Sequence, residues 1–214
     1  MKTRPAYTLS TVMKVYNLTN IVLNLCLFVI GLKATNYGIK CFQCGSDIDR
    51  FDQLTMVFGY YYLKIFDLLD TVFFVMRKKD RQVTRLHVVH HAVMPCLVWT
   101  AIKFYPYPAA MMTLVLNSFV HVVMYGYYYM ASVPEYKTFL WWKKYITVVQ
   151  LVQFMILFVQ GMSMMRCAAN NPLLQSIAWM CTCFLLYMIY SFSMFYYKSY
   201  VHAQPQKSDK LHSG

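Results

Sequence analysis

Six stretches of mostly apolar residues, each about 20 residues long, divide this 214-residue sequence. About 20 apolar residues are what an α-helix needs to cross the hydrocarbon core of a bilayer. We therefore expect an all-α, polytopic membrane protein with six transmembrane helices. Residues 1–199 should form one membrane domain, and residues 200–214 a polar, disordered tail. The predicted spans are 12–32, 54–76, 86–105, 109–132, 145–165 and 173–197.

The charged residues are few and lie mainly between the apolar stretches. Only 13% of the residues are charged, against about 25% in soluble proteins. The formal net charge of +12 is concentrated in short loops, which is typical of membrane topology and argues against nucleic acid as a partner. Fourteen of the 20 lysines and arginines fall on the side that holds both termini and the loop 77–85, and five on the other side. Because cytosolic loops carry such an excess, both termini should be cytosolic.

Three histidines at the start of the third span are the most informative polar residues. His87, His90 and His91 stand at positions i, i+3 and i+4, which places three imidazoles on one face of a helix. Ionisable side chains at membrane depth are costly and face protein or water, so they mark candidate functional sites. Three on one face favour a functional role over a purely structural one.

Three more spans carry polar residues at helical spacing. The stripes are Lys64, Asp67 and Thr71 with Asp70 adjacent, then Asn117, His121, Tyr125 and Tyr128, then Thr147, Gln150 and Gln153. Each stripe alone is also typical of polar pairs that only tie helices together. At 1.5 Å of rise per residue, most of these groups lie about 6–12 Å inside the cytosolic ends of their spans. We therefore expect one buried polar chamber that opens toward the basic loop.

The polar residues alone leave the chemistry of this chamber open. Histidine can act as a base, a nucleophile or a metal ligand. The pattern H-x-x-H-H also occurs in membrane desaturases and hydroxylases, which hold a di-iron centre with several histidine boxes. This chain has six histidines, of which His202 and His212 lie in the tail, so too few remain for that ligand set. A single zinc ion, or a metal-free acid–base or nucleophilic site, stays open.

Four motifs, in the same order, resemble those of the very-long-chain fatty acid elongases. Residues 64–71, K-I-F-D-L-L-D-T, resemble the family's K-x-x-E-x-x-D-T, and the basic run Arg77–Lys79 follows them. Leu86–Pro95 resembles the family's histidine box. Residues 117–128 fit N-x-x-x-H-x-x-M-Y-x-Y-Y, and residues 147–153 fit T-x-x-Q-x-x-Q.

The resemblance implies a fold and a reaction. The family places six helices in a barrel around an acyl tunnel, in the endoplasmic reticulum membrane. It catalyses the condensing step of elongation, in which a long-chain acyl-CoA and malonyl-CoA give a 3-oxoacyl-CoA, carbon dioxide and free CoA. The resemblance implies no metal ion and no cofactor beyond these two substrates. It also implies that His90 takes the acyl group as an acyl-imidazole, that His121 lies beside the acceptor carbon, and that Asp70, His87 and His91 support them.

The remaining polar residues of the motifs are expected to bind substrate. One or more residues of the basic stretch Arg77, Lys78, Lys79, Arg81 and Arg85 should meet CoA phosphates by charge-assisted contacts, although positive-inside loops look the same without that role. The predicted substrate-binding residues are Lys64, Asp67, Asn117, Tyr125, Tyr128, Gln150, Gln153, Arg77, Lys78 and Lys79. Membrane lipid, a second copy of this chain and the other enzymes of the elongation cycle are the expected further partners.

The chain departs from the family pattern in three places. Asp67 stands where the family usually has Glu, and Val89 replaces a common Tyr inside the histidine box. The sequence also begins where the family's second membrane helix begins, so we expect one upstream helix to be missing from it. In the family, that helix lies outside the barrel.

Cys41, Cys44 and Cys167 fall in loops that the topology places in the lumen, where disulfides can form. The resemblance supports one bridge between these loops. Gln43-Cys44 is closer than Cys41 to the family's loop motif, so the predicted pair is Cys44–Cys167, with Cys41–Cys167 as the alternative.

Two other functions would use the same residues. One is a metal-dependent membrane fatty acid oxidase or hydroxylase that employs the histidines as ligands. The other is an inactive paralogue that binds lipid without turning over malonyl-CoA.

Overall fold

The computed structural model describes residues 5–42, 48–104 and 108–202, and these ranges contain helices and no strand. This confirms the all-α prediction. The long helices are α1 (Ser10–Ala34), α2 (Arg50–Phe66), α3 (Leu68–Met76), α4 (Arg85–Phe104), α5 (Pro108–Ala131), α6 (Lys143–Cys167) and α7 (Pro172–Tyr196). The short elements are the 3-10 helices Ile39–Phe42, Asp80–Gln82 and Pro134–Trp142, and a π-helical turn, Tyr197–Val201. The predicted tail overlaps that turn at residues 200 and 201, and residues 203–214 lie outside the described ranges.

Each predicted span coincides with one helical rod, and α2 and α3 together form the second rod, interrupted at Asp67. Three helical stretches of the described ranges are long and apolar enough to cross a membrane, namely Ser10–Ala34, Thr138–Cys167 and Pro172–Val201. The break at Asp67 divides the second rod into helices of 17 and 9 residues, and α4 carries His87, His90 and His91 within its length. The number of six spans therefore stays a prediction.

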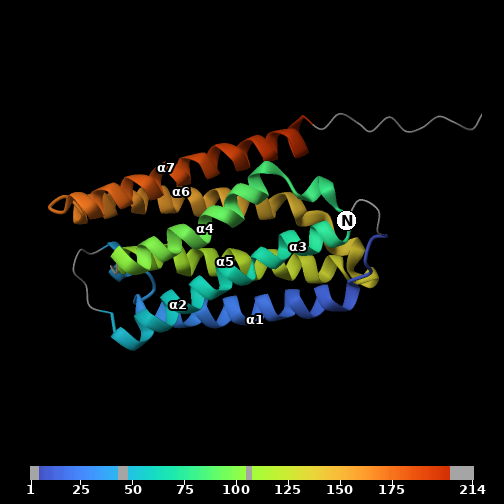
Figure 1. The fold of residues 1–214 in the computed structure, drawn as a ribbon, viewed down its shortest axis with the longest axis horizontal. Coiled ribbons are helices and arrows are strands. Elements are labelled where there is room, and N and C mark those ends of the chain that lie inside the picture. The colour runs from blue at the N-terminus through green and yellow to red at the C-terminus, as the bar shows by residue number, and fades with distance from the viewer. Residues whose placement is uncertain (1–4, 43–47, 105–107, 203–214) are drawn as a thin grey trace, which may run out of the picture.

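The helices run side by side along the long axis of the molecule (Figure 1). α1 packs most extensively on α5 and also contacts α2, α2 contacts α4, and α4 contacts α7. α7 packs along α6, and α6 contacts α5, so these pairs close a ring of neighbours. α2 also contacts α5 directly, so the second rod, α4, α7, α6 and α5 form a closed ring of neighbours without α1. Side chains on the inner faces of α2 to α7 therefore meet in the interior, with α1 against the outer side of α2 and α5.

Glycines allow α1 to lie close to α2 and α5. A Cβ atom at Gly31 would lie 2.5 Å from Met56 Cε and 2.7 Å from Val115 Cγ2. A Cβ atom at Gly59 would lie 2.9 Å from Leu27 Cδ2. Small residues at helix contacts are typical of membrane bundles, where close packing drives association.

Two helix starts follow directly from the sequence. The side chain of Asp49 accepts hydrogen bonds from the backbone N–H groups of Phe51 and Asp52, at 2.9 and 3.2 Å, so α2 begins after it. Asn171 caps α7 in the same way, with Pro172 at the first helical position. Both caps lie at the end of the molecule where α1, α4 and α6 end, which is called the far end below. The opposite end, where α4 begins, is called the histidine end.

The loop cysteines Cys41 and Cys167 differ in oxidation state. Cys167, the last residue of α6, is disulfide-bonded. Cys41 is a free thiol, buried in the apolar cluster that includes Ala34 and Met111. The alternative pair Cys41–Cys167 is therefore wrong, because packing holds the Cys41 sulfur inside the bundle. Cys44 lies outside the described residues, so its pairing with Cys167 stays a prediction.

Candidate active site

Two cavities lie one behind the other inside the bundle. The larger, called the apolar cavity below, has a volume of about 550 Å³, and the other, called the polar cavity, about 400 Å³. Four residues line both of them, namely His90, Asn117, Gln153 and Phe154. The two cavities therefore meet at the second histidine of the box. No described residue of α1 lines either cavity.

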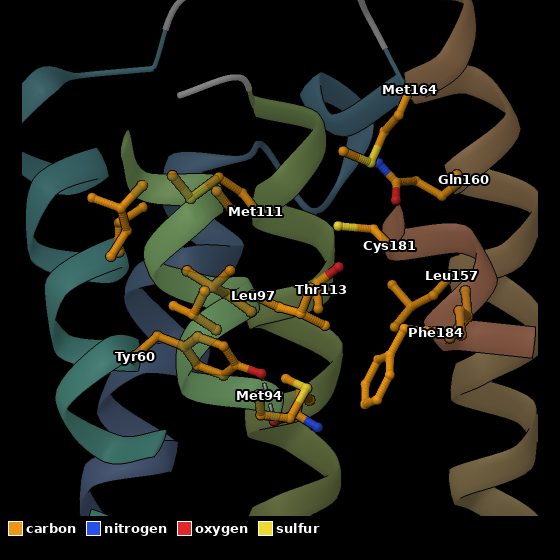
Figure 2. Close-up of a pocket in the computed structure, with 18 of the residues that line it drawn as sticks. Tyr60, Met94, Leu97, Met111, Thr113, Leu157, Gln160, Met164, Cys181 and Phe184 are labelled. Atoms are coloured by element: carbon orange, nitrogen blue, oxygen red, sulfur yellow. Dashed lines mark hydrogen bonds between the residues drawn. The ribbon is translucent and has the colours of Figure 1, made fainter. Parts of the chain in front are cut away.

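The apolar cavity extends from His90 toward the far end, between α2, α4, α5, α6 and α7. Figure 2 shows Met94, Leu97 and Met111 on one side of it and Leu157, Cys181 and Phe184 on the other. Arg50 and Gln53 line its far end. A long, mostly apolar space of this kind suits a hydrocarbon chain.

The polar cavity lies at the histidine end, and most of the predicted site residues line it. They are Asp70, His87, His90, His91, Asn117, His121, Tyr128, Gln150 and Gln153. These residues come from α3, α4, α5 and α6, so the structure brings the polar stripes together. Lys64, Asp67 and Tyr125 lie behind this wall, each with at most 3% of its surface exposed.

A buried ion pair holds the wall behind the histidines. Lys64 Nζ on α2 lies 2.8 Å from Asp67 Oδ2, at the break between α2 and α3. On α5, His121 places Nε2 3.4 Å from Lys64 Nζ and Nδ1 3.7 Å from Asp67 Oδ2. An ammonium group can only donate, so Nε2 of a neutral His121 accepts and the ring proton sits on Nδ1, toward Asp67. The three side chains thus form one unit that links α2 to α5.

Tyr125 joins two carboxyl groups. Its hydroxyl lies 3.1 Å from Asp67 Oδ1 and 2.8 Å from Asp70 Oδ2. One hydroxyl proton can be donated to only one of them, so the second contact is a hydrogen bond only if a carboxyl group carries a proton. Asp67 is paired with the Lys64 ammonium, which leaves Asp70 as the carboxyl group to carry it. Asp70 lines the polar cavity, so this proton lies at the cavity wall.

The histidines of the box have different surroundings. His87 Nε2 lies 2.9 Å from Thr71 Oγ1 on α3, and the His87 ring lies 4.2 Å from the His91 ring, between centroids. The His91 ring also contacts the His90 ring, at 5.4 Å between centroids. The buried Nδ1 of His90 has no hydrogen-bond partner among the described residues. His90 is therefore the imidazole of the box that lines both cavities, and its buried Nδ1 is left free of hydrogen bonds by the described residues.

Two amides lie beside His90 where the cavities meet. Asn117 Oδ1 accepts a hydrogen bond from the Tyr60 hydroxyl, at 2.8 Å. Gln153 Oε1 is buried and has no hydrogen-bond partner within the described part of the chain. Gln150, one turn away on α6, places Nε2 3.9 Å from the Met124 sulfur. A polar ligand group or a water molecule at this junction would satisfy the buried atoms of Gln153 and His90.

Arg81 is the one residue of the predicted basic stretch, all of which the structure describes, that lines the polar cavity. Arg77–Lys79 does not line the polar cavity, whereas Arg81 and Lys143 do. Lys78 has a positive φ of 53°, and this turn leads into the 3-10 helix Asp80–Gln82. The local turn therefore brings Arg81, and not Arg77, Lys78 or Lys79, to the cavity.

Three tyrosines at the cavities were not among the predicted site residues, although one of them, Tyr127, belongs to the motif of residues 117–128. Tyr60 is four residues before Lys64, so helical spacing already places it on the same face as the second-span stripe. Tyr127 lines the polar cavity next to the predicted Tyr128. Tyr200 also lines it, from the π-helical turn that the sequence had assigned to the tail.

Metal-ligand geometry is not found among the described residues, in which no group of three or more His, Cys, Asp or Glu side chains could hold an ion. The rings of His90 and His91 stand at 89° to each other, and those of His87 and His91 pack side by side. The site described above is built from hydrogen bonds, one ion pair and ring contacts.

Comparisons with a protein family and with individual proteins both point to fatty acid elongases. The chain matches the GNS1/SUR4 (ELO) family over residues 1–208. It is 38% identical to very long chain fatty acid elongase F of Drosophila simulans, over 94% of this chain and 80% of that protein. It is 35% identical to very long chain fatty acid elongase 5 of Xenopus tropicalis, over 94% of this chain and 68% of that protein. A similar elongase of Aedes aegypti is 36% identical, over 94% of this chain and 57% of that protein.

Proposed function

This chain belongs to the GNS1/SUR4 family, and we propose that it is the condensing enzyme of fatty acid elongation. The names of its relatives support the elongation of fatty acids. In this proposal, an acyl-CoA and malonyl-CoA give a 3-oxoacyl-CoA two carbons longer, with carbon dioxide and CoA. The observation that carries the condensing step is the position of His90, where the polar cavity meets the apolar cavity.

In the first half-reaction, a ring nitrogen of His90 attacks the thioester carbonyl of the acyl-CoA. The carbon–sulfur bond breaks, the imidazole proton passes to the sulfur, and CoA leaves as a thiol. The acyl group stays on His90 as an acyl-imidazole. The buried Nδ1 of His90 has no hydrogen-bond partner among the described residues. This supports His90 as the nucleophile, because the lone pair of a ring nitrogen must be free to attack.

In the second half-reaction, malonyl-CoA takes the place of CoA in the polar cavity. Loss of carbon dioxide leaves an enolate, whose carbon attacks the acyl carbon beside His121. The carbon–nitrogen bond breaks, and the His90 imidazole takes up one proton. Asp70, which lies at the cavity wall and shares a proton with Tyr125, is the group proposed to supply it.

The apolar cavity would hold the acyl chain. Its lining on α4 runs from His90 to Ile102, which is about 18 Å at 1.5 Å per residue. Given carbon–carbon bonds of about 1.52 Å, an extended chain advances about 1.25 Å per carbon, so about 14 carbons fit beyond His90. We propose long-chain acyl-CoA substrates of about this length.

The CoA moieties of both substrates would enter at the histidine end. Arg81 and Lys143, which line the polar cavity, are proposed to meet their phosphates. Aromatic rings of Tyr127 and Tyr200 line the same cavity and suit an adenine base. No metal ion or further cofactor takes part in this proposal.

Six membrane spans and cytosolic termini complete the proposal. The chain is a membrane protein, with three helices in its described ranges long and apolar enough to span a bilayer. The excess of lysine and arginine at the histidine end supports a cytosolic position for that end. Cytosolic CoA esters would then reach the polar cavity directly. Residence in the endoplasmic reticulum is proposed from the family.

The test is turnover of malonyl-CoA by the purified full chain. Malonyl-CoA labelled in its free carboxyl group is offered with acyl-CoAs of different lengths, and released carbon dioxide and 3-oxoacyl-CoA are measured. Condensation should depend on the acyl-CoA and peak near the length that the apolar cavity holds. Acyl-CoA binding without decarboxylation at any length would contradict the proposal and favour a lipid-binding protein. Stoichiometric iron or zinc whose removal abolishes turnover would favour the metal-dependent alternative.

A further inference from the structure

Helix α1 lines neither cavity, yet the face that it turns into the molecule is polar. Tyr16, Asn17, Asn20 and Asn24 each have at most 5% of their surface exposed. The amide groups of Asn20 and Asn24 donate to backbone carbonyls of α1 itself, at 3.2 and 2.9 Å. Tyr16 is the residue of this face whose contacts lead to the candidate active site.

Tyr16 contacts the break between α2 and α3. In a continuous helix, the N–H group of residue 70 would donate to the carbonyl of residue 66. Here the N–H of Asp70 donates to the carbonyl of Asp67, at 3.1 Å. The carbonyl of Phe66 accepts a hydrogen bond from the Tyr16 hydroxyl, at 3.4 Å. The tyrosine thus takes the position of the backbone donor that the break removes.

Tyr16 also packs against Tyr125, the residue whose hydroxyl lies 2.8 Å from Asp70 Oδ2. The Tyr16 ring is held by aromatic rings of three other helices. The ring centroids lie 5.0 Å from Phe66 on α2, 5.0 Å from Phe73 on α3 and 5.9 Å from Tyr125 on α5. These contacts fix the direction of the hydroxyl toward the break.

We propose that Tyr16 is a positioning residue of the condensing reaction. It holds the α2–α3 break through the Phe66 carbonyl and orients Asp70 toward Tyr125 and the polar cavity. Asp67 stands at the break and Asp70 in the first turn of α3, so a loss of the Tyr16 hydroxyl would move both carboxyl groups relative to the histidines of α4. This inference rests on the proposed function and extends it to a helix outside the cavity walls.

The experiment compares Tyr16→Phe with Tyr37→Phe in the full chain. Both substitutions remove one hydroxyl, and the Tyr37 side chain is 77% exposed, so it controls for the loss of a tyrosine hydroxyl as such. For Tyr16→Phe we expect kcat to fall about 10- to 100-fold, because small misplacements of reacting groups have effects of this size. The KM values for both substrates should stay within about twofold of wild type, because the CoA and acyl-chain walls are untouched. The pH dependence of kcat should also shift, since a displaced Asp70 would lose its 2.8 Å contact with the Tyr125 hydroxyl.

Wild-type kcat and pH profile in Tyr16→Phe would overturn the inference. A loss of activity that disappears when the rate is expressed per folded molecule would overturn it as well, because the tyrosine would then act on folding alone. If Tyr16→Phe does not fold, 3-fluorotyrosine at position 16 keeps the hydroxyl and makes it more acidic. The pH profile should then shift, and an unchanged profile would reject the positioning role. These outcomes can be distinguished from a failure of the proposed function, because in that case wild type and Tyr37→Phe would also lack turnover.

Discussion

The polar cavity and the apolar cavity share His90, but their walls are held in different ways. Behind the polar cavity, Lys64, Asp67, His121 and Tyr125 connect α2 and the α2–α3 break to α5 through polar contacts of 2.8–3.7 Å. The walls of the apolar cavity consist mostly of aliphatic, aromatic and sulfur-containing side chains, as Figure 2 shows for Met94, Met111 and Leu157. One wall is a network of directional contacts, and the other is held by packing.

The difference corresponds to two tasks. Groups that react need fixed positions, because a displacement of about 1 Å can lower a rate about 100-fold. A hydrocarbon chain needs volume and shape, and methionine side chains adapt to irregular shapes. Changes in the polar wall should therefore reduce the reaction for every substrate. Changes in the apolar wall should alter which chain lengths react.

The largest effect is expected from His90→Ala. Removal of the proposed nucleophile should lower condensation by at least about 10³-fold and abolish the acyl adduct, while acyl chains still enter the apolar cavity. Mass spectrometry after incubation with acyl-CoA alone should find the adduct on His90 of wild type. His202→Ala, an exposed histidine after α7, is the matched control. Undiminished elongation by His90→Ala would disprove the assignment.

The next effect concerns the buried ion pair. Lys64→Met leaves the Asp67 carboxylate buried without its partner, at a cost of about 3–5 kcal/mol in the free energy of unfolding. The double variant Lys64→Met/Asp67→Leu removes both charges and should recover part of that stability, although not the activity. Thermal unfolding and condensation of both variants, measured in the same detergent, test this. Equal destabilisation of the single and double variants would show that the pair does not hold the polar wall.

Helical spacing explains how much of this site could be predicted from the sequence. Residues three or four positions apart share a helix face whatever the tertiary structure. Lys64 and Asp67 are therefore found in contact, and Asn117, His121 and Tyr125 are found on the inward face of α5. The helix boundaries were predicted to within a few residues for the same local reason.

The parts that were missed depend on contacts between helices and on local turns. The interruption at Asp67 has no Gly or Pro beside it in the sequence, and Tyr16 meets it from a distant segment. Likewise, the composition of the basic loop does not distinguish Arg77 from Arg81. The turn at Lys78 decides which of them faces the cavity.

The apolar wall is tested by adding volume. Cys181 lines the apolar cavity, whereas Cys183, two residues later on α7, is exposed on the bundle surface. Cys181→Phe should lower condensation of the longest accepted acyl-CoAs about 10-fold and spare shorter ones, because extra side-chain volume shortens the cavity. Cys183→Phe should leave the length profile unchanged. If Cys181→Phe lowers condensation equally for all acyl-chain lengths, the substitution disturbs the fold or Cys181 lines a part of the cavity that every chain occupies.

A smaller effect is expected at the entrance. Exposed charge contacts contribute about 0.2–1 kcal/mol each, and 1.4 kcal/mol corresponds to a tenfold change. Arg81→Gln/Lys143→Gln should therefore raise KM for both CoA substrates about 2- to 30-fold. Lys78→Gln/Lys79→Gln removes the same charge from residues that do not line the polar cavity. If both double variants raise KM equally, a position at the wall of the polar cavity does not determine which basic residues bind CoA.

The smallest effect on the reaction is expected at the far end, from loss of the Cys167 disulfide. Met164, one turn before Cys167 on α6, lines the apolar cavity, so the bridge supports that wall and not the polar one. Cys167→Ser should leave acylation of His90 within about twofold of wild type, and any change should appear in the chain-length profile.

Alkylation identifies the partner of Cys167. Burial raises the pKa of the Cys41 thiol to about 11, and the thiolate is the reactive form. About one Cys41 in a thousand is therefore thiolate at pH 8. Cys41 should be alkylated slowly at pH 8 and faster as the pH rises toward 11, without prior reduction. Cys167 should be alkylated only after reduction, in wild type and in Cys41→Ser alike. Alkylation of Cys167 without reduction in Cys44→Ser, and not in Cys41→Ser, would assign the bridge to Cys44, and the reverse pattern would reject that pairing.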